Sequence, residues 1–565
     1  MLRLLLIPTF LAALVVGAVV WSGSDAGSAD RADFTFINRG DHKSMDPNQM
    51  SWMQDIRTAY ALWEGLYTLD PVTMKPVLGC ADRVEVDPQT HTIWTFHIRS
   101  DARWSNGDPV TARDFIFSWR RFLETPWDYT YLHFYIRGAR QYAKQVEDNA
   151  QAAQRGATTR PLDFSGVGEE ALDDHTLRVT LTNPVPFFPA LCAFPPFFPM
   201  NEKSMESFAK RDEATGIIHY DEKFTRPPNL VTNGPYRMAE WSFKRRMRLV
   251  ASDFYWDRAH VKSKVIDEKF AEDPLAAYRA YERGEVDWLS DVYTTPDIAA
   301  DILSHGGRSD LHVFTGFGTY FYSFNCLPKL PDGRSNPLVD IRVRQALCMA
   351  LDKEPIVRET GRLGQPIARD YIPPGVFDDY ASPAGLPFDV AGAKKLLAQA
   401  GYPDGRGFPH LTILYNTDGN HADVAQIIRR QWLTNLGVDT DLEGVEVKIF
   451  GERLRTQKYD IARASWYGDY DDPSTFTDKY KSDSEDNDAK WVNQQYDRLC
   501  SQAQVEADPH KRLQLLAQAE NILLNEAPIL PIYHYVNAFM FRGNVKGIPL
   551  SPGGLQMFQT IQVLR

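Results

Sequence analysis

Strand patterns and helix patterns alternate along the whole of this chain, and this mixture restricts the fold more than any other feature. Residues 94–98 and 176–182 each alternate apolar with polar side chains, as a strand with one buried face does. Between them, Thr111 and Asp114 form a T-x-x-D capping box ahead of a one-sided apolar helix. Four further helices are predicted, and their end signals are Asp340, Gly401, Gly437 and Asp508. The pattern predicts an α/β protein with some antiparallel hairpins.

The length of the chain predicts more than one domain. At 565 residues it exceeds the size at which a single hydrophobic core keeps growing, so two or three domains are expected. Residues 147–170 are polar and rich in Gly, Ala and Gln, which favours a surface excursion over a regular element. The sequence has no internal repeat, and this argues against solenoids and arrays.

The first thirty residues have the layout of a secretory signal. Arg3 precedes an almost wholly apolar run over residues 4–21, and small polar residues follow. Residues 1–29 are therefore expected to be a signal peptide cut near residues 27–29, or, because the run is long, an uncleaved N-terminal anchor. Either reading places the protein outside the cytoplasm, in the periplasm or cell envelope. No cysteine lies near this segment, so lipid attachment there is excluded.

Composition and motif content exclude several classes of function. The formal net charge of −12 argues against a nucleic-acid partner, because neutralising phosphates requires a basic surface. The chain has no G-x-S-x-G elbow, Walker A loop, G-x-G-x-x-G or H-E-x-x-H, and its thirteen histidines do not cluster with metal-ligand spacing. We therefore expect no enzyme, no metal and no other cofactor. The five cysteines are scattered, and their odd number leaves at least one free thiol.

Residues 459–473 form the most informative segment, since they read as a strand that ends in an acidic turn. A strand edge, a tryptophan wall and a carboxylate would suit an extended peptide with its ammonium group. The alternative is a buried strand whose acidic tail is only a solvated turn. An EF-hand calcium loop does not fit the spacing and lacks its glycine.

At this segment the sequence resembles the periplasmic oligopeptide-binding and dipeptide-binding proteins of ABC importers, solute-binding protein family 5. The resemblance covers nearly the whole chain after about residue 34, and its motifs run in family order. The motifs are residues 44–47, 62–66, 104–112, 171–177, 231–236, 340–347 and 460–469, and the pair 526–528 and 535–538.

The resemblance implies a two-lobed periplasmic-binding-protein fold of type II with an additional third domain. Domain I would be a split lobe made of residues 34–63, 202–317 and 536–565. Domain II, the extra domain, would be residues 64–201. Domain III, the second lobe, would be residues 318–535.

The resemblance also implies a ligand site between the lobes. Asp469 matches the carboxylate that holds the α-ammonium group of the peptide. Ser465, Trp466 and Tyr467 match the strand that pairs with the peptide main chain, and Met50, Ser51 and Trp52 match the facing segment of the other lobe. Arg463 and Arg455 match basic residues of the site, and Tyr129, Phe194 and Asp291 match further ligand-facing positions.

Three departures from the family pattern fall in the predicted pockets. Ser51 stands where well-studied members carry an acidic residue, so a preference for basic side chains would be reduced. Cysteines are absent at Gly318 and Tyr467, where some members form a disulfide. Phe194 replaces a polar residue.

The resemblance implies a monomeric protein that binds short peptides and delivers them to the permease subunits of an ABC importer. The same fold also binds sugars, opines or metal chelates, so those ligands stay open. A carboxylate-pair hydrolase that uses Asp469 with Asp471 or Asp472 is a further alternative. If the N-terminal run stays uncleaved, a receptor or chaperone-like surface protein is favoured.

Overall fold

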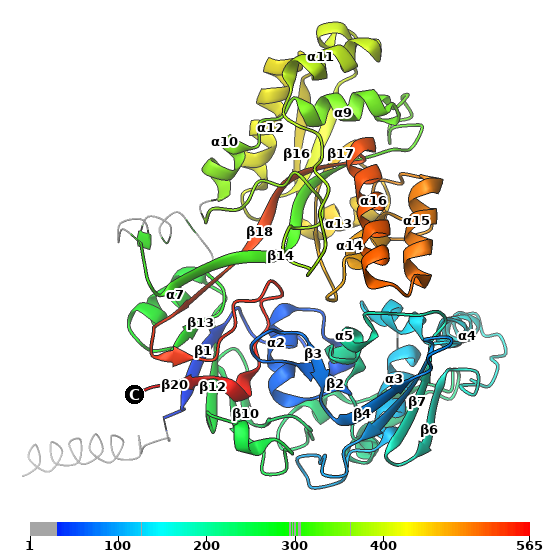
Figure 1. Cartoon of the computed structure of the whole chain (residues 1–565), viewed down its shortest axis with the longest axis vertical. Helices are drawn as coiled ribbons and strands as arrows, with labels where there is room; N and C mark the ends of the chain where they lie inside the picture. Colours follow the sequence, from blue (N-terminus) through cyan, green and yellow to red (C-terminus); the bar gives the residue numbers. More distant parts are fainter. Residues whose placement is uncertain are drawn as a thin grey trace, which may run out of the picture.

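The computed structural model in Figure 1 describes residues 31–565, apart from 126, 293–294, 296–297, 299–300, 303–306 and 362. The predicted signal or anchor, residues 1–29, lies outside the described residues. Among the helices that are described, not one combines the length and apolar character needed to cross a membrane.

One ten-stranded sheet runs through both lobes. Its order is β10-β11-β12-β1-β13-β18-β14-β17-β15-β16. In the first lobe β1 lies parallel to β12 and β13, while β10 and β11 form an antiparallel edge. The bounds are β10 (Tyr236–Ser242), β11 (Arg246–Ala251), β12 (Val265–Phe270), β1 (Phe34–Asn38), β13 (Trp288–Leu289), β18 (Ile529–Phe541), β14 (Leu311–Phe324), β17 (Ile461–Tyr467), β15 (Leu411–Asn416) and β16 (Thr440–Val445).

Two long antiparallel strands, β14 and β18, join the lobes (Figure 1). Near one end, Phe539 belongs to the hydrophobic core of the first lobe, and the partly buried Phe314 packs against that core. Further along the strands, Tyr322 and Tyr533 belong to the core of the second lobe. The register shifts between Thr315 and Thr319, and such an irregularity bends a strand and increases its twist. The lobes are thus joined by a strand pair whose pairing is interrupted near its middle.

Helices cover the second-lobe part of this sheet. The predicted helix starts at Asp340 and Asp508 are confirmed, since the side chain of each accepts a backbone N–H of the following turn. The side chain of Asp389 caps its helix in the same way. Gly437 ends its helix in the left-handed conformation, at φ 71°. The bounds are α9 (Ile341–Met349), α10 (Glu354–Ile356), α11 (Val390–Gln399), α12 (His421–Leu436), α13 (Val447–Arg455), α14 (Ser474–Thr477), α15 (Gln494–Val505) and α16 (Pro509–Glu526).

The extra domain is built on a separate four-stranded sheet of order β4-β5-β7-β6. Phe96 and Trp104 of this domain share one hydrophobic core with Phe36 and Trp63, so the domain enlarges the first lobe. The predicted capping box at Thr111 and Asp114 is present. The bounds are β4 (Ala81–Val86), β5 (Ile93–Ile98), β7 (Thr176–Thr180), β6 (Glu169–Asp173), α3 (Ala112–Glu124), α4 (Ala139–Gln154) and α5 (Phe188–Cys192).

The expectation of an irregular excursion over residues 147–170 is wrong for its first third. Residues 147–154 continue α4, because apolar positions such as Tyr142 and Val146 bury one face of that helix. The remaining elements are short, apart from α2 and α7. They are α2 (Met53–Leu62), β2 (Tyr67–Leu69), β3 (Pro76–Leu78), α6 (Glu202–Met205), β8 (Ala209–Arg211), β9 (Ile218–Tyr220), α7 (Pro274–Glu282), β19 (Val545–Lys546) and β20 (Gln562–Val563).

Candidate functional site

Strand β17 presents an unpaired edge over most of its length. One side pairs with β14 throughout, and Thr319 lies opposite Trp466 and Tyr320 opposite Ser465. On the other side β15 pairs only with Ile461 and Ala462. Among the strands that the structure describes, none therefore lies along that side from Arg463 to Tyr467. This edge leaves main-chain groups available to an extended ligand.

Side chains behind β17 fix its two aromatic residues. The indole N–H of Trp466 donates to the carbonyl oxygen of Thr475 at 2.8 Å, and the ammonium of Lys479 lies 4.7 Å from its ring centroid. Tyr467 stacks on Tyr535 with 4.7 Å between ring centroids, and about half of its surface is exposed. Trp466 is thus held from behind, while Tyr467 presents a rigid aromatic surface.

Asp469 follows β17 in a tightly held turn. The N–H of Gly468 donates to the carbonyl oxygen of Phe317 at 2.8 Å, and the N–H of Asp469 donates to Thr475 Oγ1 at 2.9 Å. Burial raises the pKa of Asp469 to about 6, against the effect of a hydrogen bond from Tyr131. With this pKa the carboxylate is largely ionised at neutral pH. Within the described residues it forms no ion pair, so it lacks a cation.

The extra domain supplies aromatic residues beside this carboxylate. The hydroxyl of Tyr131 donates to Asp469 Oδ2 at 2.5 Å. Burial and the nearby Asp469 raise the pKa of Tyr129, whose ring meets Phe194 edge-on at 5.1 Å. The predicted residues Tyr129 and Phe194 therefore lie near Asp469, but Tyr131 was missed. The Tyr-x-Tyr spacing places both tyrosines in one segment without showing which of them reaches the acid.

Arg463 forms a second polar centre on β17. Its guanidinium carbon lies 5.1 Å from the ring centroid of Tyr320, and Nη2 donates to the hydroxyl of Tyr535 at 3.3 Å. Its Nε is buried without a hydrogen-bond partner, and no described carboxylate lies within ion-pair distance. Arg463 is thus a partly buried cation available to an anionic group.

His421, which sequence reasoning also missed, lies beside Arg463 at the start of α12. Its Nδ1 is 3.0 Å from the hydroxyl of Tyr320, and burial together with Arg463 lowers its pKa to about 4. It is therefore neutral at pH 7 and able to donate or accept a hydrogen bond. Arg455 is not brought to this centre, because it lies exposed at the end of α13 ahead of β17.

The predicted first-lobe segment contains three residues with different environments. Met50 is buried in the core of the first lobe, so only its main chain is available to a ligand. Ser51 is partly buried. Trp52 is 48% exposed immediately before α2, and the ammonium of Lys43 lies 3.4 Å from its ring centroid.

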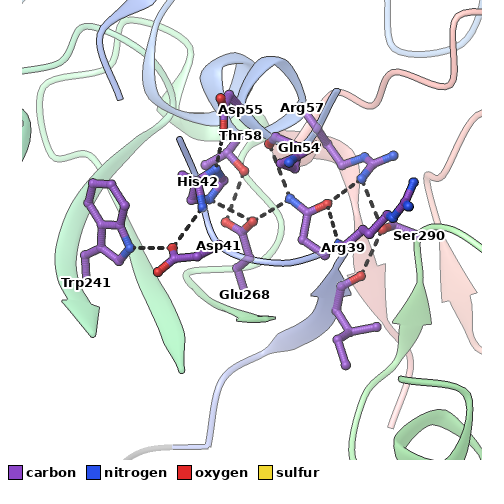
Figure 2. Close-up of polar contacts among 12 residues, drawn as sticks. Arg39, Asp41, His42, Gln54, Asp55, Arg57, Thr58, Trp241, Glu268 and Ser290 are labelled. Atoms are coloured by element: carbon purple, nitrogen blue, oxygen red, sulfur yellow. Dashed lines mark hydrogen bonds and ion pairs between the residues drawn. The ribbon is translucent and has the colours of Figure 1, made fainter. Parts of the chain in front are cut away.

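Asp291 belongs to a different set of contacts, the buried polar network behind that segment. Arg57 pairs with Asp291 at 3.2 Å and also donates to Asn38. It donates to Ser290 as well (Figure 2). About one third of the Asp291 side chain stays exposed. Asp291 follows β13 and Asp469 follows β17, and each of these strands runs parallel to a neighbouring strand. Each acid therefore lies beyond the carboxyl end of its strand. Ligands of open α/β sheets bind at such ends.

The comparisons with known proteins agree with this architecture. The family model described as bacterial extracellular solute-binding proteins, family 5 Middle, matches residues 75–488. The chain belongs to this family. In the structure Gly318 and Tyr467 are register partners on the neighbouring strands β14 and β17. The five cysteines of this family member are all free.

Several relatives match the family member over most of its length. An oligopeptide-binding protein OppA of Bacillus subtilis is 33% identical over 85% of this chain and 83% of its own. The periplasmic oligopeptide-binding protein OppA of Salmonella typhimurium is 31% identical over 92% and 90%.

Solved structures match as well. The unliganded open form of MppA, a periplasmic murein tripeptide binding protein, superposes with a TM-score of 0.76 at 29% identity, over 95% of this chain and 98% of that one. Haemophilus influenzae OppA in complex with RPPGFSPFR gives 0.72 at 28% identity, over 95% and 100%.

Proposed function

We propose that this solute-binding protein captures short peptides between its two lobes, outside the cytoplasm, and delivers them unchanged to the permease subunits of an ABC importer. It acts as a monomer and a carrier, and catalyses no reaction. The relatives named as oligopeptide-binding and murein tripeptide binding proteins support the choice of peptide over sugar, opine or metal chelate.

The observation that carries this proposal is the open edge of β17 that leads to the unpaired carboxylate of Asp469. An extended peptide added to that edge exchanges main-chain hydrogen bonds with Arg463 to Tyr467. Its α-ammonium group supplies the cation that Asp469 lacks, in a charge-assisted hydrogen bond. Its carboxylate end supplies the anion that Arg463 lacks, with His421 as a neutral partner.

The strand pair β14 and β18 is the proposed hinge. The interrupted pairing between Thr315 and Thr319 lies close to the proposed boundaries at 317/318 and 535/536. Closure about these strands brings the first-lobe segment of Met50, Ser51 and Trp52 toward the peptide. The domains proposed are I (34–63, 202–317 and 536–565), II (64–201) and III (318–535).

Calorimetry with the tripeptide Ala-Ala-Ala and its N-acetylated form tests the proposal. We expect acetylation or Asp469→Asn to weaken binding roughly 30-fold or more, because each removes one partner of a buried charge pair. Asp471→Asn is the matched control, since Asp471 lies in the same turn but is exposed. Equal binding of both peptides would contradict the ammonium assignment.

Mass spectrometry of the recovered peptide should show it intact, whereas cleavage that depends on Asp469 would indicate a hydrolase.

Mass spectrometry of the exported protein also tests its N-terminus. Cleavage near residues 27–29 is the expected result. Retention of residues 1–29 would indicate a membrane-anchored binding protein.

A further inference from the structure

Three buried side chains meet at the second-lobe end of the proposed hinge. Thr319 of β14 and His534 of β18 are register partners, and they form the first pair after the interruption that begins at Thr315. The imidazole Nδ1 of His534 lies 2.8 Å from Thr319 Oγ1, and its Nε2 lies 2.6 Å from Asp370 Oδ1. Thr319 and His534 are almost fully buried, and Asp370 is 8% exposed. The imidazole therefore joins both hinge strands to the segment that contains Asp370.

That segment, residues 366–372, lies along the other edge of β18. Main-chain hydrogen bonds that involve the N–H groups of His534 and Ala368 tie it to the strand, at 2.9 Å and 3.1 Å. Glu520 of α16 accepts two main-chain N–H groups of the same segment, at 2.8 Å each. The segment is thus anchored to the body of the second lobe, and His534 fastens the hinge to it.

The hydrogen-bond partners of His534 determine how many protons its ring carries. Thr319 Oγ1 lies 2.8 Å from the carbonyl oxygen of Tyr371, so the single hydroxyl proton lies between these two oxygens. Toward His534 the hydroxyl oxygen can then only accept, and Nδ1 must carry a proton. Nε2 faces a carboxylate oxygen of Asp370, which also accepts, so this nitrogen must carry a proton as well. A ring with both protons is an imidazolium cation, which forms a buried ion pair with Asp370.

Two other titratable groups adjoin residues 366–372. The ammonium of Lys353 donates to the carbonyl oxygen of Ala368 at 2.7 Å, and the carboxyl group of Glu520 binds main-chain N–H groups. Both of these groups bind the main chain of the segment, so Asp370 is the acid that pairs with the ring.

The irregular part of the hinge lies directly beside this clamp of Thr319, His534 and Asp370. Residues 316–318 of β14 stand opposite Tyr535 alone, and such a bulge is a place where a strand bends. Within the bulge, the carbonyl oxygen of Phe317 accepts the N–H of Gly468, in the turn after β17, at 2.8 Å. Because the clamp fixes the strands from Thr319 onward, bending is confined to the bulge, which stays joined to the peptide site.

We propose that His534 is an imidazolium and a positioning residue for lobe closure, because it fastens the hinge strands to the second lobe beside the bulge. The inference rests on the proposed function, since the hinge serves closure around a peptide. A hinge that bends at one place gives one closed arrangement of the lobes. If the strands also yield beyond Thr319, the arrangement that holds a peptide is less populated, and the apparent affinity falls in proportion.

Nitrogen-15 NMR of the whole protein, labelled in its histidines, tests the charge at pH 7.5. We expect the His534 resonances, identified by their absence in His534→Gln, to show a proton on both ring nitrogens. An ordinary histidine is mostly neutral at this pH. Asp370→Asn should remove the second proton, because an amide can donate to Nε2, and this change identifies the same resonances independently. A neutral His534 ring in the unmodified protein would overturn the inference.

Two other buried histidines supply the reference signals. Burial lowers the pKa of His42, but the carboxylates of Glu268 and Asp55 raise it to about 10, so its ring carries both protons. Burial lowers the pKa of His133 to about 3, so its ring is neutral. The His534 spectrum should match that of His42 and differ from that of His133.

Calorimetry with Ala-Ala-Ala tests the positioning role. His534→Gln should weaken binding about tenfold, within the usual range of coupling between separate sites. The double variant His534→Gln/Asp370→Asn should bind more tightly than His534→Gln, because it leaves no buried carboxylate without its cation. A ring that acts by packing alone would give a double variant no better than the single one.

His312→Gln is the matched control, since His312 lies at the first-lobe end of β14, where its ring stacks on Phe541 at 4.0 Å. Its affinity for Ala-Ala-Ala should equal that of the unmodified protein. Equal affinities of His534→Gln and His312→Gln, or no gain in the double variant, would overturn the positioning role and leave peptide binding intact. Failure of the unmodified protein to bind Ala-Ala-Ala would instead overturn the proposed function, and the NMR spectrum would still report the charge of His534.

Discussion

The two faces of the proposed peptide site are held in place by different kinds of structure. The second-lobe face is a sheet strand, β17, whose position is fixed by its register with β14. The first-lobe face, Met50 to Trp52, is a short extended segment between a 3₁₀ turn and α2. It is held from behind by the buried network of Figure 2. The comparison shows that one face depends on main-chain pairing and the other on buried charge.

His42 is the central cation of that network. Its Nδ1 lies 3.1 Å from Asp55 Oδ1, and its Nε2 lies 2.9 Å from Glu268 Oε1. Burial alone would lower the pKa of His42, but the two carboxylates raise it to about 10. The imidazolium thus links α2, which begins directly after Trp52, to strand β12.

The largest expected effect comes from His42→Ala, which breaks the first-lobe face. Two buried carboxylates would lose their shared cation, so the free energy of unfolding should fall by about 3–5 kcal/mol. Urea denaturation measures this change. His260→Ala is the control, because His260 forms an exposed pair with Asp257 and should cost less than about 1 kcal/mol. Equal costs for the two variants would show that the network does not anchor this face.

Gly468→Ala should break the second-lobe face without touching the first. A Cβ at residue 468 would lie 2.2 Å from the ring of Phe317, and Phe377 and Phe476 leave that ring little room to move. The turn must shift and displace Asp469, so peptide affinity should fall about 10-fold to 100-fold, the equivalent of roughly 1–3 kcal/mol of overpacking. Calorimetry measures the affinity.

Gly451→Ala is the control for that substitution, since a Cβ at residue 451 meets nothing within 4 Å. The affinity of Gly451→Ala for peptide should not change. If Gly468→Ala binds peptide as tightly as the control, the close packing of Phe317 on the turn does not position Asp469.

The difference between the faces also explains what could be predicted from the sequence. The alternation of β17 and the acidic turn after it are local, and the resemblance supplied the role of Asp469. The bond from Tyr131 to Asp469 joins residues 338 apart in the sequence, so no local pattern could indicate it. His42 and His421 were missed for the same reason, because their partners meet only through the fold. Met50 was expected in the segment that faces the peptide, and its side chain packs in the core. A residue-by-residue match does not distinguish a main-chain contact from a side-chain contact.

The pH dependence of stability sharpens the comparison, since only the first-lobe face depends on a titrating cation. The folded-state pKa of His42, about 10, lies above its usual 6.5, so its contribution is complete below about pH 6.5 and is lost as the pH rises to 10. Between pH 7 and 9.5 the free energy of unfolding should decline by up to roughly 1.4 kcal/mol per pH unit from this group. His42→Gln should remove that part of the slope. Parallel slopes in the two proteins would show that His42 is not charged in the fold.

The smallest expected effect is on the exposed end of the first-lobe face. Trp52→Ala removes a ring that is 48% exposed and lies against Lys43, so stability should stay unchanged. If Trp52 packs on bound peptide, affinity should fall about 2-fold to 5-fold, as expected for one exposed aromatic contact. Phe243→Ala is the control, because Phe243 is 67% exposed in the turn between β10 and β11, outside the proposed site.

Calorimetry separates three outcomes for these two variants. A loss restricted to Trp52→Ala places the first-lobe face on the ligand. No loss would leave β17 and the extra domain as the only binding surfaces, and a loss as large as that of Asp469→Asn would show that aromatic packing outweighs recognition of the ammonium group.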